Sequence, residues 1–344
     1  MVTGLCNISC DYCIAKDLPR IAMTTQIGRA AIDLFLDLAT GCSTVDFVFT
    51  GGEPLTEISL LSNLTEYART QANNKGISPN FILKTNGIIA NKKAFEYLNC
   101  FRPKVVISID GDHEAHDAHR KIRNITNTHN IIIGNILKFI KSDMDCSASL
   151  TVHPDQAANV LDSVRFLRDL GIDEINIAPA YGTTHWSPEQ ISQLSKSIID
   201  VAYFIRGAKG DVGPIYRNTV HVNKQLQGVW GCEAASTTLA FLPDGSIAGC
   251  SALAMLVASF PELILGNTSD GLDQTAIDYT IKLASATEIE RPECAFCRTA
   301  DNCAGGCLAF NLSSTLAPFS PPKIYCSTIS IIPEAWNIAW NSSR

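Results

Sequence analysis

Three cysteines stand close together near the start of the chain, Cys6, Cys10 and Cys13, in a C-x3-C-x2-C spacing. Thiolates at this spacing can hold three irons of a [4Fe-4S] cube and leave the fourth iron open to a ligand, which is a catalytic arrangement. A zinc site or chance clustering would place the same residues together. The spacing alone therefore predicts a metal centre and leaves the identity of the metal open.

Seven further cysteines follow in the last third of the chain. Their middle part has a C-x2-C-x5-C-x3-C spacing, and clustered cysteines in a reducing compartment are more often metal ligands than disulfide partners. The spacing predicts metal, with zinc as the alternative to iron-sulfur. The isolated Cys42, Cys100 and Cys146 are expected to be small buried hydrophobic residues. The seven are Cys232, Cys250, Cys294, Cys297, Cys303, Cys307 and Cys326.

The elements that must position these cysteines alternate between strands and helices. Helices are expected at Gln26 to Ala39 and Gln156 to Leu170, where apolar residues recur at helical spacing. The alternation predicts an α/β fold with a parallel sheet, which right-handed crossovers would curl into a partial (β/α)6 TIM-like barrel. Strands are expected at Met1 to Gly4, Val45 to Thr50, Asn80 to Lys84, Lys104 to Ile109, Ser147 to Val152 and Glu174 to Ala178.

Polar and glycine-rich residues follow three of these strands, as Thr50 to Pro54, Thr85-Asn86-Gly87 and Asp110-Gly111. The carboxyl ends of parallel strands meet at one edge of a barrel, where such folds bind their ligands. We therefore expect these residues to surround one mouth.

The β-α alternation stops after about residue 225, where glycine and cysteine become more frequent. We expect a small cysteine-rich C-terminal iron-sulfur domain there, in which bound metal takes the place of a large hydrophobic core. A helix is predicted to begin at Ser187-Pro188-Glu189-Gln190, which has a capping-box pattern with proline at the first helical position. The predicted domains are residues 1–185 for the barrel, 186–228 for a bridging helical segment and 229–344 for the cysteine-rich domain.

The charge of the chain is spread evenly, with 27 basic and 34 acidic side chains and a formal net charge of -7. This balance predicts no nucleic-acid partner and no binding to a membrane surface. The sequence contains no apolar run long enough to span a membrane and no signal peptide, so a cytoplasmic location is expected.

The cysteine triplet with Tyr12 before its third cysteine, followed by Gly51-Gly52-Glu53-Pro54, resembles the radical S-adenosylmethionine (SAM) enzymes. In that family SAM chelates the open iron through its amino and carboxylate groups. The resemblance implies that Tyr12 packs over the cluster loop near the adenine and that the two glycines let the backbone approach the ligand. It also implies that Pro54 fixes the turn and that the Glu53 carboxylate accepts from the SAM ammonium.

The segment from Ser108 to Arg120 resembles the family's fourth-strand segment. The resemblance implies that Ser108 contacts the ribose and Arg120 the SAM carboxylate. The same segment contains His113, His116 and His119, whose spacing of three residues could mark a metal-binding helix face. A solvated helix start beside the ribose site is the simpler interpretation.

The seven later cysteines, with a glycine five residues before the second, resemble the SPASM extension of radical SAM enzymes, which holds two auxiliary [4Fe-4S] clusters. The resemblance therefore implies three [4Fe-4S] clusters in all, one binding SAM and two auxiliary. The second auxiliary set has only three thiolates. By the family's pattern one set is Cys294, Cys297, Cys303 and Cys326, and the other is Cys232, Cys250 and Cys307.

The resemblance implies cleavage of SAM to a 5'-deoxyadenosyl radical that abstracts hydrogen from a substrate. The leading hypothesis is a maturase that forms a side-chain cross-link in a ribosomally made peptide, with a one-electron donor such as flavodoxin or ferredoxin. An anaerobic sulfatase maturase that forms formylglycine is an alternative, as is a peptide epimerase. Sulfatase maturases carry an aspartate base after the second SPASM cysteine, where this chain has Ser251, and the departure disfavours that alternative.

A different class of function is a non-catalytic iron-sulfur electron carrier or a zinc-supported binding module. An electron carrier needs no open iron, so the GGEP turn and the SAM-like strand ends disfavour that class. The sequence identifies no catalytic residue and no substrate-binding residue.

Overall fold

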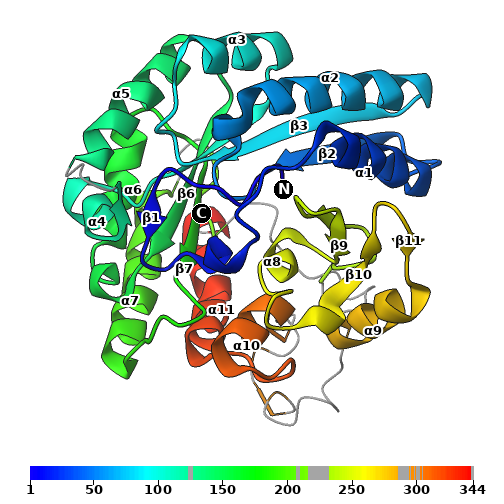
Figure 1. Cartoon of the computed structure of the whole chain (residues 1–344). Coiled ribbons are helices and arrows are strands. Elements are labelled where there is room, and N and C mark those ends of the chain that lie inside the picture. Colours follow the sequence, from blue (N-terminus) through cyan, green and yellow to red (C-terminus); the bar gives the residue numbers. More distant parts are fainter. Residues whose placement is uncertain are drawn as a thin grey trace.

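A parallel sheet of five strands, in the order β2-β3-β4-β6-β7, forms the centre of the molecule (Figure 1). The computed structural model describes residues 1–122, 127–206, 210–215, 232–285, 294, 296–297, 299, 303 and 305–341. Each of the five strands of this sheet begins and ends within two residues of its predicted position. The strands are β2 (Thr44–Phe49), β3 (Ser78–Thr85), β4 (Lys104–Ser108), β6 (Cys146–Val152) and β7 (Ile175–Pro179).

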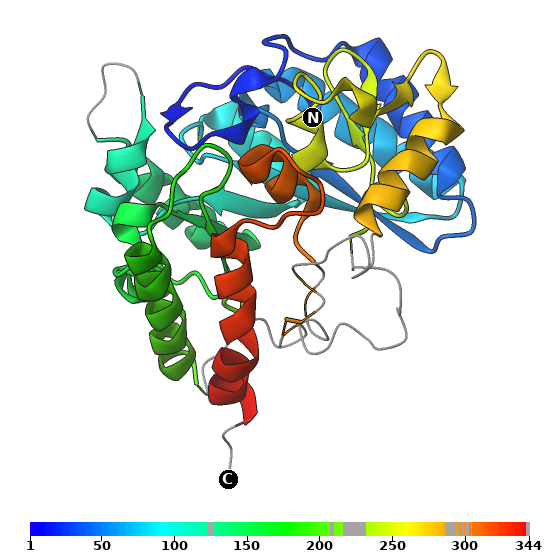
Figure 2. The same ribbon diagram turned by 90° about the horizontal axis from the view of Figure 1, so that it is seen from below.

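Helices cover the outer face of the curved sheet, as Figures 1 and 2 show together. The parallel register between all neighbouring strands requires these crossovers, so the α/β partial barrel is confirmed. The helix predicted from Gln156 to Leu170 begins later, at Val160, and Gln156 instead ends a separate 3-10 turn, Pro154–Gln156. The helices are α1 (Thr25–Leu38), α2 (Ile58–Asn74), α3 (Lys92–Phe101), α4 (His113–His119), α5 (Thr128–Lys141) and α6 (Val160–Asp169).

The sixth strand, predicted at Met1 to Gly4, is reduced to isolated bridges. The backbone N–H of Val2 donates to the carbonyl of Thr50 (3.1 Å), and Thr3 bridges both Gly51 and Ala22. Because the segment shares its backbone groups between two neighbours, no continuous ladder forms. It still runs along the exit of β2 and carries the chain into the cysteine loop.

The main hydrophobic core lies between the sheet and its helices. Strand residues such as Leu83, Ile107 and Leu150 are almost fully buried in it. Helices α7 (Pro188–Phe204) and α11 (Lys323–Trp336) extend the same core and pack side by side (Figure 2). The predicted capping box at Ser187 is confirmed at the start of α7.

The cysteine-rich part of the chain has short elements and a small core. Its sheet is antiparallel, in the order β11-β10-β9-β8. The predicted domain boundary between residues 228 and 229 lies outside the described residues. The elements are β8 (Ala240–Phe241), β9 (Ser246–Ala248), α8 (Ser251–Ala254), β10 (Ile264–Asn267), β11 (Gly271–Leu272), α9 (Gln274–Ala284) and α10 (Leu308–Thr315).

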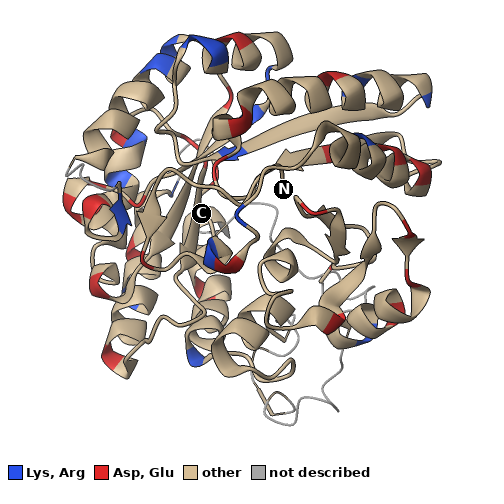
Figure 3. Cartoon of the chain, in the orientation of Figure 1, with Lys and Arg blue, Asp and Glu red and all other residues tan. Residues whose placement is uncertain are grey.

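Acidic and basic residues are interspersed over the helices of the described chain, without a continuous basic band (Figure 3). Among the described residues, no helix combines the length and the apolar character that crossing a membrane requires. The first observation agrees with the even spread of charge along the sequence.

Candidate active site

The first three cysteines lie in a loop that is fastened to the barrel by a two-stranded ribbon. Strand β1 (Ser9–Cys10) pairs antiparallel with β5 (Arg120–Lys121), so Cys10 lies opposite Arg120. The three thiols are close enough for their charges to interact, and none forms a disulfide. Burial raises the pKa of Cys10 to about 12, although Arg120 acts in the opposite direction. Buried thiolates need cationic partners, and the irons of a cluster would supply them.

The GGEP turn holds the segment that leads into this loop. The N–H groups of Gly52 and Glu53 donate to the carbonyls of Thr3 and Leu5, both at 2.8 Å. A β-carbon at Gly51 would lie 2.2 Å from the Thr3 carbonyl oxygen, and one at Gly52 would lie 2.0 Å from that of Leu5. In the structure, these glycines therefore allow the chain's own N-terminal segment to approach the GGEP turn closely.

The Glu53 carboxylate braces the ends of β2 and β3. It is fully buried and accepts hydrogen bonds from the N–H of Leu55 (3.0 Å), the hydroxyl of Thr85 (2.8 Å) and the N–H of Asn86 (2.7 Å). The Asn86 amide in turn donates to Asn7 Oδ1 (2.7 Å) and lies 3.8 Å from Cys6 Sγ. A contact of Glu53 with the SAM ammonium stays a prediction. In the structure, the Glu53 carboxylate accepts its hydrogen bonds from protein groups.

Arg120 is engaged by a residue that the sequence analysis did not assign to the site, Asp110. Arg120 Nε and Nη2 donate to the two oxygens of the Asp110 carboxylate (2.8 and 2.9 Å), and the Thr151 N–H adds a third hydrogen bond (2.9 Å). The Tyr12 hydroxyl also donates to Asp110, while the Arg120 guanidinium lies 5.3 Å from the centre of the Tyr12 ring. Arg120 Nη1 lies 3.8 Å from Cys10 Sγ. The predicted contact with the SAM carboxylate remains untested.

The other residues of the Ser108 to Arg120 segment divide between two environments. Ser108 is half-buried at the end of β4, opposite Ser149 of β6. His116 and His119 are buried, so the expectation of a solvated helix start is wrong for both, while His113 is exposed. Residues three apart are neighbours on a helix, but among the described residues only His119 of the three belongs to a group of potential metal ligands, so the three rings form no common metal site.

The later cysteines fall into the two groups that the SPASM resemblance implies. Cys307 lies close enough to interact with Cys250 and Cys232, and burial raises its pKa to about 11. Cys326 interacts in the same way with the remaining set, Cys303, Cys294 and Cys297. Both groups fit iron-sulfur clusters, and the ligand roles stay predictions.

Two of the three isolated cysteines do not behave as predicted. Cys42 and Cys100 are exposed, so the expectation of buried packing is wrong for them, while Cys146 is half-buried and packs against the main core. Both exposed residues lie near the ends of helices, where the amphipathic pattern of the neighbouring sequence no longer determines which side faces the core.

Tyr181 is a site residue that the sequence analysis missed. It follows β7, its ring centre lies 3.5 Å from that of Phe310, and its pKa is raised by burial and by the nearby Cys307 and Cys250. The next residue, Gly182, lies beside Ile14 of the first cysteine loop. The segment after β7 therefore lies between the first cysteine loop and the group that contains Cys250 and Cys307. Its only sequence signal is its position at a strand end.

Comparison with known proteins extends this description. A family model described as a 4Fe-4S single cluster domain matches residues 1–133. The chain is 33% identical over 123 residues to an uncharacterized protein of Methanocaldococcus jannaschii, covering 36% of this chain and 41% of that protein. It is 21% identical over 334 residues to the radical SAM cyclopropyl synthase TigE of Paramaledivibacter caminithermalis, covering 90% of this chain and 66% of that protein.

A third relative is the serine-type anaerobic sulfatase-maturating enzyme of Bacteroides thetaiotaomicron, 25% identical over 186 residues, which are 52% of this chain and 44% of that enzyme. The chain thus matches between 41% and 66% of the length of these three relatives.

Solved structures share the fold over nearly the whole chain. Native anSMEcpe with bound AdoMet superposes with a TM-score of 0.81 at 20% identity, covering 99% of this chain and 98% of that one. Streptococcus suis SuiB bound to S-adenosylmethionine has a TM-score of 0.63 at 16% identity, covering 94% and 75%. The cysteine motif, the sequence relatives and the shared architecture thus make the chain similar to radical SAM enzymes that have a cysteine-rich C-terminal region of the SPASM type.

Proposed function

We propose that this enzyme is a maturase that oxidises a side chain of a peptide or protein substrate, in the manner of the anaerobic sulfatase-maturating enzymes. The observation that carries the proposal is the full-length similarity to anSMEcpe, together with the gathering of the later cysteines into two groups. Sulfatase maturases also recur among the sequence relatives. The comparisons thus favour this alternative over the cross-linking hypothesis of the sequence analysis.

In this proposal each group of residues has a separate task. Cys6, Cys10 and Cys13 would hold the SAM-binding [4Fe-4S] cluster, and the two later groups would hold auxiliary clusters. Cluster and SAM, when bound, supply hydrogen-atom abstraction. Tyr12, Ser108 and Arg120 would orient SAM, with Asp110 fixing Tyr12 and Arg120. A two-electron oxidation of the substrate would also need an acceptor for one electron and a base for one proton, and the auxiliary clusters held by the two later cysteine groups would supply the acceptor.

Cross-link formation is the second candidate, favoured by one specific feature. Ser251 opens α8 directly after Cys250, at the position where the family's pattern places the aspartate base of sulfatase maturases. TigE, a cyclopropyl synthase by name, matches 90% of the chain, and SuiB has been solved with its precursor peptide SuiA. A ribosomally made precursor peptide would then be the substrate.

The remaining expectations belong to the same proposal. The enzyme would use a one-electron donor such as flavodoxin or ferredoxin and would work in the cytoplasm, where its cysteines stay reduced. The barrel would comprise residues 1–185, the bridging segment 186–228 and the SPASM domain 229–344.

The test is an anaerobic reaction of the cluster-loaded enzyme with SAM and a reductant. One substrate is a sulfatase-derived peptide with Cys or Ser at the modified position, and the others are peptides encoded beside the gene. Mass spectrometry with a hydrazide trap distinguishes the products, because formylglycine is an aldehyde and reacts whereas a cross-linked peptide that has lost two hydrogens does not. Cys13→Ala is the inactive control. If SAM is consumed and every peptide stays unchanged, side-chain oxidation of these substrates is excluded.

A further inference from the structure

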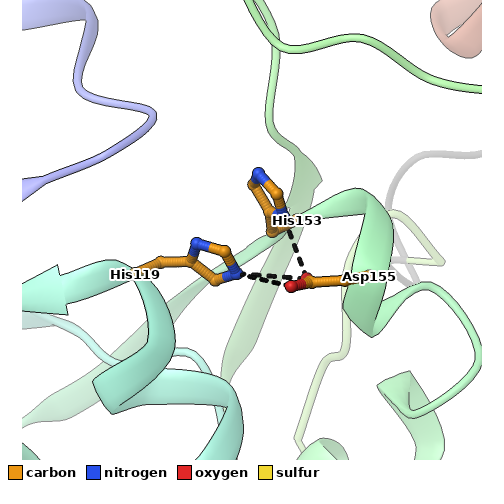
Figure 4. A group of neighbouring side chains, drawn as sticks. All are labelled: His119, His153 and Asp155. Carbon is orange, nitrogen blue, oxygen red and sulfur yellow. Dashed lines mark hydrogen bonds and ion pairs between the residues drawn. The ribbon is translucent and has the colours of Figure 1, made fainter.

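A group of three side chains lies next to the first cysteine loop and has no part in the function proposed above. His119 ends α4, while His153 and Asp155 follow β6 (Figure 4). His119 Nε2 lies 3.1 and 3.0 Å from the two Asp155 carboxylate oxygens, and His153 Nδ1 lies 2.9 Å from Oδ1. Two imidazoles from different elements therefore direct a ring nitrogen at one carboxylate.

These distances match the donor spacing around a small divalent cation. Metal-ligand bonds of about 2.1 Å at right angles place neighbouring donor atoms about 3 Å apart. Two imidazoles and one carboxylate are a donor set that first-row divalent metals accept. In the metal-free chain, hydrogen bonds to the shared carboxylate hold the same atoms together.

A second carboxylate lies on the far side of His119. The Nδ1 atom of His119 is buried, has no hydrogen-bond partner among the described residues and lies 3.4 Å from Asp11 Oδ2, while Lys121 Nζ lies 3.6 Å from the same oxygen. Imidazoles that bind metal through one nitrogen usually direct the other N–H toward a carboxylate, which fixes the tautomer and the ring orientation. Asp11 belongs to the loop between Cys10 and Cys13, so this arrangement would connect the cation to the first cluster loop.

Exposure is graded across the three ligands. The His119 side chain is 9% exposed, that of His153 is 27% exposed and that of Asp155 is 51% exposed. The cation would thus be held from one side by the protein and remain open to water on the other. The two imidazole rings are stacked, with centres 3.8 Å apart and planes inclined by 30°. Coordination of one ion by both rings would require His153, the more exposed ring, to rotate out of this stack while its Nδ1 stays near Asp155.

We propose that His119, His153 and Asp155 form a binding site for one divalent first-row metal ion, distinct from the cysteine clusters. The ion takes nitrogen and oxygen ligands from the chain and completes its coordination with water. Its effect is to fasten the end of β6 to the end of α4 and, through Asp11, to the loop that carries Cys10. This site does not depend on which substrate the enzyme oxidises.

The experiment uses the full chain with its iron-sulfur clusters loaded, so that the cysteines are occupied. Mn²⁺ is the probe, because it prefers nitrogen and oxygen ligands to thiolates. The oxidised [4Fe-4S] clusters give no signal that overlaps with free Mn²⁺ in electron paramagnetic resonance, so bound and free metal can be separated. The variants are His153→Ala and the nearly isosteric Asp155→Asn. The control is His113→Ala, which removes an exposed histidine from the same helix as His119. Iron and sulfide contents show that each variant has folded and is loaded.

We expect one Mn²⁺ per wild-type chain, unchanged affinity in His113→Ala and a dissociation constant raised at least about tenfold in His153→Ala and Asp155→Asn. Added Mn²⁺ should also raise the thermal midpoint of the wild type and of the control and leave the two site variants unchanged. The proposal is overturned if the wild type binds no stoichiometric Mn²⁺, or if the four proteins bind it equally. Since the readout is bound metal, the result is independent of the test of the proposed function.

Discussion

The first cysteine loop and the later cysteine groups are held in place in different ways. Around Cys10, neighbouring side chains form a buried polar network on the ends of β4 and β6, and the loop rests on a large barrel core. Cys232, Cys250 and Cys307 instead pack against a small core that includes Leu253, Leu263 and Leu308. The first site is therefore built largely by the protein, while the second group is expected to depend on its metal for stability.

Loss of the auxiliary clusters should produce the largest difference in local stability between the two regions. In Cys250→Ala we expect amide hydrogen exchange in residues 232–285 to rise by at least about 100-fold, because metal binding replaces core packing there. The barrel strands should keep their protection. Hydrogen-exchange mass spectrometry measures both regions at once. Cys100→Ala, which removes an exposed cysteine outside every group, is the control. Equal opening of the barrel would show that the two regions do not differ as proposed.

Asp110→Asn tests the polar network of the first site. The Arg120 and Asp110 side chains are only 7% and 4% exposed, so the substitution leaves a buried guanidinium without its countercharge. We expect the free energy of unfolding to fall by about 3 to 5 kcal/mol, with weaker loading of the first cluster, as measured by urea unfolding and iron analysis. Asp33→Asn, at an exposed partner of Tyr67, is the control and should change stability by less than about 0.5 kcal/mol. A small effect at Asp110 would mean that the network does not support the loop.

Gly52→Ala tests the approach of the N-terminal segment. The added methyl group would collide with the Leu5 carbonyl, so we expect a loss of about 3 kcal/mol and displacement of Cys6. Gly134→Ala is the matched control, because a β-carbon at Gly134 has no neighbour within 4 Å in α5. That substitution should stabilise the protein by up to about 1 kcal/mol. Thermal unfolding and iron content would show whether the two substitutions have opposite effects.

Replacement of the buried His116 should have the smallest effect on stability, and this effect depends on pH. Burial and then the nearby Arg120 lower the pKa of His116 from 6.5 to about 3. Since the folded pKa lies below the unfolded one, this contribution is complete above about pH 6.5 and is lost as the pH falls toward 3. Between pH 7 and pH 5 the wild type should lose about 2 kcal/mol that His116→Gln does not lose. Parallel unfolding curves for both proteins across this range would contradict the assignment.

The sequence predicts the barrel well because each of its strands is a short apolar run between amphipathic helices. It misses features that depend on contacts between distant residues. Asp110 stands out in the sequence only as a strand-end residue, and its pairing with Arg120 requires α4 to turn the chain back. The polarity of His116 and His119 favours solvent and gives no sign that α4 lies against Asp110 and Asp155. Likewise, nothing local to Tyr181 indicates that Phe310 packs on it.

The two cysteine regions differ in predictability for the same reason. Spacing predicts that the cysteines bind metal, and the resemblance to the SPASM extension implies how the later ones divide into two sets. Neither predicts what surrounds them. The roles of Glu53 and the two glycines in holding the N-terminal segment emerge only when the segment and the strand ends are seen together.

Helix α4 has only seven residues, His113 to His119, between the end of β4 and the ribbon that holds Cys10. An α-helix turns by about 100° per residue. One inserted residue would therefore turn Arg120 away from Asp110 and His119 away from Asp155 in a single step. The number of residues in this helix therefore sets the directions of Arg120 and His119. We expect insertions and deletions to be tolerated on either side of the helix far more readily than within it.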